Sequence, residues 1–216
     1  MKQDFLDAYF VELKYVRDLS KADSKVMSIS PQIEKDLRPF IGVVVIVNDK
    51  KYCIPLTSPK SKFNVKSKED FIKIPDSKLK DLNGAPRIIG ILNLNNMIPV
   101  SDEVITKIDF SDKTKLSNSA QQLLFNELKW CRDNVKVISN RANKLYNKIT
   151  QTPEKDRNLT RRCCDFKKLE AILEKRLAKS NEQTKPLFSR SAQKSFAEKA
   201  AERPQHNDKN KNDIEH

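Results

Sequence analysis

The sequence predicts an α+β fold, in which strands from the first half of the chain form a sheet that packs against helices from the second half. Three observations support this prediction. Short apolar runs separated by turn residues are confined to the first 100 residues. Two of these runs, within residues 40–56, have the pattern of a β-hairpin. From residue 119 onwards, apolar residues recur every three or four positions, which is the period of an α-helix.

The hairpin is the clearest local signal. Residues 41–47 are an apolar run that predicts a buried strand, and residues 52–56 predict the strand that returns beside it. Between them, residues 48–50 (Asn-Asp-Lys) are typical of a turn. The returning strand therefore brings residues 57–60, with the sequence Thr-Ser-Pro-Lys, to one end of the sheet. Because proline favours an extended residue before it, Ser58 is expected to be held in one orientation.

Other strands are expected over residues 8–13, 72–74, 88–94 and 97–100, the first of them followed by a helical turn over residues 14–19. Pro75, Gly84 and Pro86 are expected in the connection between the strands at 72–74 and 88–94. A single long amphipathic helix is predicted over residues 119–149, with Ser119 and Gln122 as its capping box. A final helix is predicted over residues 165–177.

The chain carries a net charge of +13 and is expected to form one folded domain, residues 1–177, followed by a polar, disordered tail, residues 178–216. Lys and Arg exceed Asp and Glu by 11 over residues 1–176 and by only 2 over residues 177–216. The basic character therefore belongs to the folded part. This excess favours a polyanionic partner, nucleic acid first and an anionic membrane surface second.

Several classes of protein are excluded by what the sequence lacks. No apolar run approaches the roughly 18–20 residues of a membrane span, and three early acidic residues argue against a signal peptide, so a cytoplasmic protein is expected. With three glycines, the chain has no nucleotide-binding glycine-rich loop. Both histidines, His206 and His216, fall in the tail, which excludes a catalytic histidine in the folded part. The four cysteines form no Cys-x-x-Cys pair, so buried reduced thiols are favoured over a metal site.

RNA cleavage is chemistry that this chain has the residue types to perform without a cofactor. The 2′-hydroxyl of RNA attacks the adjacent phosphorus, and cations and hydroxyl groups stabilise the charge that develops. Thr57, Ser58 and Lys60 supply such groups, and Arg38, just before the first hairpin strand, is expected at the same end of the hairpin. The alternative is that residues 57–60 are an ordinary turn that ends a strand.

Two further basic segments have open interpretations. Lys62, Lys66 and Lys68, with Phe63 among them, form either a basic groove with a ring on which bases stack, or a solvated loop with one anchoring ring. Arg161 and Arg162 either bind phosphate or face solvent. Trp130 and Tyr146 are interpreted as packing residues.

An ordered series of motifs resembles the ToxN/AbiQ family, the endoribonuclease toxins of type III toxin–antitoxin systems. The resemblance spans roughly residues 8–177, and its first motif begins just before the first hairpin strand. In chain order the motifs are Arg38-Pro39-Phe40-Ile41-Gly42, Tyr52-x-x-Pro55-Leu56-Thr57-Ser58-Pro59-Lys60, Leu92-Asn93-Leu94-Asn95-Asn96-Met97-Ile98-Pro99-Val100, Leu124-Phe125-Asn126-Glu127-Leu128, Arg132, Cys164-Asp165-Phe166 and Leu169-Glu170. The resemblance implies a single compact domain with a strongly twisted antiparallel sheet and packed helices, like the Kid/MazF toxins.

The resemblance also implies a function. It implies sequence-selective RNA cleavage without a metal or other cofactor, leaving 2′,3′-cyclic phosphate and 5′-hydroxyl ends on cellular or phage RNA. It implies inhibition by an RNA antitoxin, processed from repeats into pseudoknots, that alternates with the toxin in a closed ring, in plasmid maintenance or abortive phage infection. Two other hypotheses stay open: a non-catalytic module that binds structured RNA, and a ribonuclease toxin with a protein antitoxin.

Carried over residue by residue, the family's site maps onto Thr57, Ser58, Lys60 and Arg38. The family often has lysine where this chain has Arg38. Arginine keeps the positive charge but does not release a proton at ordinary pH, so Lys60 is the expected proton donor. Some relatives carry a tyrosine one turn before this basic residue, and the chain has Glu34 at that position.

Overall fold

The computed structural model describes residues 6–27, 40–60, 68–112 and 116–184. The chain divides into two compact units, Met1–Lys175 and Arg176–His216. Of the expected tail, residues 185–216 lie outside the described residues. The first unit contains the whole β-sheet and the candidate site.

Seven strands of the described residues form one sheet, in the order β4–β5–β3–β2–β1–β7, with β6 pairing to β3 off this path. All pairs are antiparallel. The strands are β1 (Ala8–Val11), β2 (Phe40–Val47), β3 (Lys50–Thr57), β4 (Ile72–Lys80), β5 (Pro86–Leu92), β6 (Ile98–Pro99) and β7 (Ile105–Lys107). The predicted α+β class with an antiparallel sheet is therefore confirmed.

The predicted hairpin is confirmed as β2 and β3, and its turn has only two residues. Val47 pairs with Lys50, which leaves Asn48 and Asp49 between the strands. Both have positive φ, 49° and 62° respectively. This is the pattern of a type I′ turn, whose twist matches that of the strands it joins.

Strand β4 is longer than the predicted segment 72–74, and β5 begins and ends two residues before the predicted segment 88–94. Pro75 therefore lies within β4 and Pro86 within β5, and not in the connection between them. Because β4 is at the edge of the sheet and its register shifts on both sides of Pro75, the missing N–H group is tolerated. Strand β7 was not predicted, since only three residues pair and two of them are exposed.

The helices follow the strands, except for α1, which comes directly after β1. They are α1 (Leu13–Ala22), α2 (Asn118–Asp133), α3 (Val135–Gln151), α4 (Arg157–Arg162) and α5 (Phe166–Thr184), with short 3-10 turns η3 (Leu94–Asn96) and η4 (Pro153–Asp156). Helix α1 is longer than the predicted turn, and α5 extends past the predicted end at residue 177. Helix α4 was not predicted.

The prediction of one helix over residues 119–149 is wrong, because the segment is two helices that meet at Asn134. This residue has a non-helical backbone (φ −115°, ψ 17°), and its side-chain Nδ2 donates to the carbonyl of Trp130 at 2.9 Å. Asparagine competes in this way with helical hydrogen bonding. The predicted capping box is also wrong: Ser117 caps α2, and its Oγ accepts from the backbone N–H of Ala120 at 3.3 Å.

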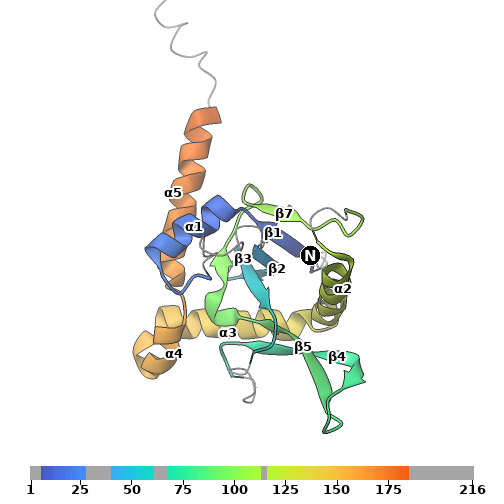
Figure 1. Cartoon of the computed structure of the whole chain (residues 1–216). Helices are drawn as coiled ribbons and strands as arrows, with labels where there is room; N and C mark the ends of the chain where they lie inside the picture. The colour runs from blue at the N-terminus through green and yellow to red at the C-terminus, as the bar shows by residue number, and fades with distance from the viewer. Residues whose placement is uncertain (1–5, 28–39, 61–67, 113–115, 185–216) are drawn as a thin grey trace, which may run out of the picture. The chain divides into compact units, whose positions relative to one another are not determined.

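The apolar stripes of α2 and α3 face the sheet, as predicted. Figure 1 shows α3 running beside the sheet, where it contacts β2. Helix α2 contacts β4 and β5. There Glu127 is buried against Gly90, and a Cβ at Gly90 would lie 2.2 Å from the Glu127 Oε1 atom, so any larger residue at this position would displace the Glu127 carboxyl group. Tyr146, predicted as a packing residue, is fully buried in α3.

Candidate functional site

Strand β3 changes its partner along its length, and this change forms the site. Near its start it pairs with β6, through Tyr52 and Cys53. At its end, Leu56 pairs with Leu92 and Thr57 with Ile91, both of β5. The chain between β5 and β6 is an asparagine-rich turn, residues 93–96, which contains η3. This turn therefore lies beside the end of β3.

The Thr-Ser-Pro-Lys segment leaves the sheet at this point. Ser58 and Lys60 are exposed, whereas Thr57 is half-buried. Asn93 holds the end of the strand at two places: its Nδ2 donates to Thr57 Oγ1 at 2.9 Å, and its backbone N–H donates to the carbonyl of Pro55 at 3.1 Å. Asn93 itself is only 6% exposed. A buried amide thus fixes the hydroxyl next to Ser58.

The other asparagines of the turn bind backbone groups. The Asn95 backbone N–H donates to the carbonyl of Asp70 at 3.0 Å, and its Nδ2 donates to the carbonyl of Arg162 at 3.1 Å. Asn96 Nδ2 donates to the carbonyl of Lys25 at 2.6 Å. Asn95 and Asn96 therefore join the turn to distant segments, while the side chain of Asn93 reaches a candidate catalytic residue.

Residues 68–71 are held by helices α3 and α4. Arg141 of α3 donates to the carbonyl of Lys68 and, at 2.9 Å, to that of Phe71. Arg162 of α4 forms an ion pair with the buried Asp70, with 2.8 Å between Nε and Oδ2. This bond raises the pKa of Arg162, so its positive charge is permanent.

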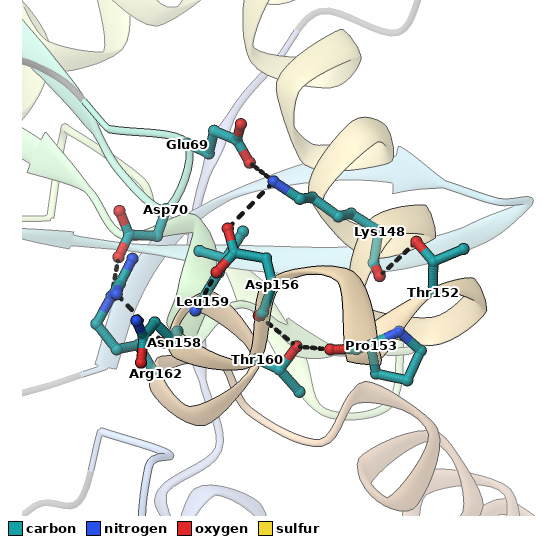
Figure 2. A network of polar contacts seen from close by, with 10 residues as sticks. All are labelled: Glu69, Asp70, Lys148, Thr152, Pro153, Asp156, Asn158, Leu159, Thr160 and Arg162. Atoms are coloured by element: carbon teal, nitrogen blue, oxygen red, sulfur yellow. Dashed lines mark hydrogen bonds and ion pairs between the residues drawn. The ribbon is translucent and has the colours of Figure 1, made fainter.

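Figure 2 shows the polar network around this point. Lys148 of α3 bridges Glu69, at 2.7 Å, and Asp156, at 3.3 Å. Asp156 also caps α4, since its Oδ1 accepts from the backbone N–H of Leu159 at 2.9 Å. That bond, with the help of Lys148, holds the pKa of Asp156 below its ordinary value. The segment that follows residues 61–67 is thereby tied to both helices.

Three of the predicted catalytic residues lie together, because Thr57 ends β3 and Ser58 and Lys60 follow it within three positions. Lys68 and Arg161 are exposed, and Arg162 is engaged with Asp70. The remaining predicted site residues, Arg38, Lys62, Phe63 and Lys66, lie outside the described residues. Sequence reasoning missed the role of Asn93, although this residue belongs to one of the motifs that carry the family resemblance.

The cysteines are buried and free of disulfides, as predicted. Burial raises the pKa of Cys163 and of Cys164 to about 12, which leaves both thiols protonated and unreactive at neutral pH. Among the described residues, no group of three or more His, Cys, Asp or Glu side chains is placed to hold a metal ion. In the same part of the chain, no helix has both the length and the apolar character needed to cross a bilayer.

Comparison with known proteins gives consistent results. Residues 7–174 match the family model described as the toxin ToxN of type III toxin–antitoxin systems. The chain is 32% identical over 163 residues to the endoribonuclease ToxN of Bacillus thuringiensis subsp. kurstaki, a match that covers 74% of this chain and 78% of that protein.

Two solved structures share the fold at 26% sequence identity. One concerns selective toxin inhibition by a non-coding RNA pseudoknot in type III systems; its TM-score is 0.63, with 80% of this chain and 98% of that chain covered. The other is AbiQ, a lactococcal anti-phage endoribonuclease, with a TM-score of 0.61 and coverage of 78% and 96%. Because the family model spans more than three quarters of the chain and the solved structures share its fold, this chain belongs to the ToxN toxin family of type III toxin–antitoxin systems.

Proposed function

We propose that this chain is an endoribonuclease toxin that cleaves RNA by attack of the 2′-hydroxyl. In this reaction the 2′-oxygen loses its proton and bonds to the adjacent phosphorus, while the bond from phosphorus to the 5′-oxygen breaks and that oxygen takes up a proton. The products are a 2′,3′-cyclic phosphate and a 5′-hydroxyl. Both the Bacillus relative and AbiQ are endoribonucleases by name, which supports the activity.

One observation carries the proposal: the family match coincides with two hydroxyls and a cation where β3 leaves the sheet. Ser58 and Lys60 are exposed there, and Thr57 is held by Asn93. Ser58 hydrogen-bonds the attacking 2′-hydroxyl or the scissile phosphate, and Thr57 donates to a phosphate oxygen. Lys60 balances the charge on the phosphorane and protonates the leaving oxygen. Arg38, at the family's basic position, adds a fixed positive charge.

The nucleophile belongs to the RNA, so the proposed reaction needs no metal. Full activity in excess EDTA is expected, and loss of cleavage that Mg²⁺ restores would contradict this part of the proposal. Lys62, Phe63, Lys66, Lys68 and Arg161 are proposed to contact the RNA beyond the scissile bond. The charge of Arg162 is partly offset by Asp70, so its contribution is expected to be smaller.

The proposed inhibitor is an RNA antitoxin, as in the related complex with a non-coding RNA pseudoknot. We extend the proposal to processing of repeat RNA by the toxin and to a closed ring of alternating protein and RNA. The toxin domain is proposed to comprise residues 1–177, with a strongly twisted sheet like that of the Kid/MazF toxins. An anti-phage role is proposed by analogy with AbiQ.

The test compares the wild type, Ser58→Ala and a matched control, Ser111→Ala. Ser111 is also an exposed serine, but it follows β7 at the opposite edge of the sheet from β4. Each protein is expressed with and without repeat RNA from upstream of its gene, and the 5′-hydroxyl ends of transcripts are mapped. The proposal is supported if the wild type and Ser111→Ala, but not Ser58→Ala, produce new 5′-hydroxyl ends at one short sequence. The repeat RNA should suppress these ends.

The other outcomes separate the alternatives. If transcripts from the wild type and Ser58→Ala cells do not differ, the enzyme proposal fails, and purified toxin that still binds the repeat RNA is a binding module. If the wild type cleaves but a small upstream protein suppresses the cleavage, the antitoxin is a protein. If Ser58→Ala loses RNA affinity as much as activity, Ser58 is a binding residue.

A further inference from the structure

The end of β3 is organised by a residue outside the proposed catalytic set. Asn93 lies 36 positions from Thr57 in sequence, yet its side chain reaches the Thr57 hydroxyl at 2.9 Å. Its backbone N–H binds Pro55, two residues before Thr57 on the same strand. Asn93 is therefore fixed to β3 at one point and directs its amide at the hydroxyl from there.

The direction of this hydrogen bond has a chemical consequence. A threonine hydroxyl has one hydrogen to donate and two lone pairs to accept with. Asn93 donates to Thr57 Oγ1 and so occupies a lone pair, leaving the hydroxyl hydrogen for another acceptor. Within the described part of the chain, the Thr57 hydroxyl has no such acceptor. Thr57 is also β-branched, which restricts the positions its hydroxyl can take.

From these contacts we infer that Asn93 is a positioning residue, which orients the Thr57 hydroxyl so that its hydrogen is donated to the phosphate undergoing cleavage. This inference rests on the proposed function. Asn93 acts through Thr57 and touches no reacting atom. An oriented donor costs no reorganisation when charge develops on the phosphate oxygen, so the benefit falls on the chemical step and not on RNA binding.

A double-mutant cycle tests this role. Asn93→Ala and Thr57→Val are made singly and together in the full-length toxin, and kcat and KM are measured on a short RNA that contains the cleavage site. Asn93→Ala is expected to lower kcat about 10- to 100-fold with KM within about 3-fold of the wild type. In the Thr57→Val background, which has no hydroxyl to orient, the same change is expected to lower kcat less than about 2-fold.

Two further variants exclude a merely structural role. Asn93→Asp keeps the shape but can only accept from Thr57, so it withdraws the hydroxyl hydrogen and is expected to lower kcat at least as much as Asn93→Ala. Asn96→Ala removes a neighbouring amide whose hydrogen-bond acceptors, among the residues that the structure describes, are the Lys25 carbonyl and the Cys164 Sγ atom. It is expected to lower the melting temperature as Asn93→Ala does, but to leave kcat within about 2-fold of the wild type.

Each result decides between the proposals. Equal losses from Asn93→Ala in the wild-type and Thr57→Val backgrounds would overturn the inference and leave the nuclease intact, as would an effect of Asn93→Ala on KM alone. A loss of kcat in Asn96→Ala equal to that in Asn93→Ala would also overturn it, since general loosening of the turn would then explain both. Absence of cleavage by the wild type would overturn the proposed function itself, and the inference with it.

Discussion

Two buried glutamates have pKa values shifted in opposite directions, and each shift predicts how stability depends on pH. Glu127, against Gly90, has no hydrogen-bond or ion-pair partner within the described residues, and burial raises its pKa from 4.5 to about 7. The protonated form is thus favoured in the folded state. The contribution of Glu127 to stability is fully present below about pH 4.5 and is lost as the pH rises through 7.

We therefore expect Glu127→Gln to stabilise the protein at pH 8, by up to about 3 kcal/mol, and to have little effect at pH 4.5. The replacement is a neutral side chain of the same shape, so packing against Gly90 is kept. The free energy of unfolding in urea, measured for the variant and the wild type from pH 4.5 to 8.5, checks this. A difference that stays constant with pH would contradict it.

Glu170 is the opposite case. Burial alone would raise the pKa of this carboxyl, but hydrogen bonds from Lys50, Tyr52 and Tyr146, at 2.7–2.8 Å, hold it below its ordinary value. Its contribution to stability is present above the unfolded pKa and is lost as the pH falls through the lowered folded value. Glu170→Gln is expected to cost about 3 kcal/mol at pH 7 and less at pH 4. Urea unfolding at these two pH values measures the loss, and an equal loss at both would contradict the assignment.

At the residue scale, the sequence reveals the site only in part. Thr57, Ser58 and Lys60 lie within four positions at the end of a recognisable strand, so their grouping was predictable. The contact of Asn93 with Thr57 was not, because it depends on how β5 and β6 both pair with β3. An asparagine in a turn is ordinary, and only the pairing of strands distant in sequence shows what its side chain binds.

At the scale of elements, two turns provide a matched pair of predictions: Asp49 lies in the turn between β2 and β3, and Gly84 in the connection between β4 and β5. Asp49 has a φ of 62°, a conformation that strains a residue with a Cβ atom, whereas glycine adopts it without strain. Asp49→Gly should therefore stabilise the protein by about 0.5–1 kcal/mol. Gly84 has φ of 77° and free space where a Cβ would be, so Gly84→Ala adds strain alone and should destabilise by about 1 kcal/mol. Melting temperatures of the two variants that shift in the same direction would contradict the assignment of strain.

The elements themselves were predictable where apolar periodicity was strong. The hairpin and the stripes of α2 and α3 follow from it. The break at Asn134 was not predictable, since the apolar period continues across this single non-helical residue. The end of α2 is marked by the backbone conformation of Asn134 and by its side-chain bond to Trp130. Pro75 was misinterpreted for a related reason: proline disfavours a strand unless the strand is at an edge, and the edge position of β4 is a property of the whole sheet.

At the scale of the whole molecule, the charge distribution predicts how the proposed binding of RNA depends on salt. The excess of 11 positive charges over residues 1–176 should make affinity for the repeat RNA fall steeply with salt, because every phosphate neutralised releases counterions. Residues 185–216 contain seven Lys and Arg but also five Asp and Glu. We therefore expect a protein of residues 1–184 to bind with nearly the same salt dependence as the full chain.

Dissociation constants measured from 50 to 300 mM KCl decide this, with Ser58→Ala in both proteins so that the RNA is not cleaved. If residues 185–216 do not contact the RNA, the slopes of log affinity against log salt for the full chain and for residues 1–184 should differ by less than about one. If all seven basic residues of the tail contacted phosphate, truncation would reduce the slope by about five, at roughly 0.7 for each contact with single-stranded RNA. A change of that size, with an unaltered melting temperature, would contradict the prediction. It would show that basic residues of the tail, and not only those of residues 1–184, contact the RNA.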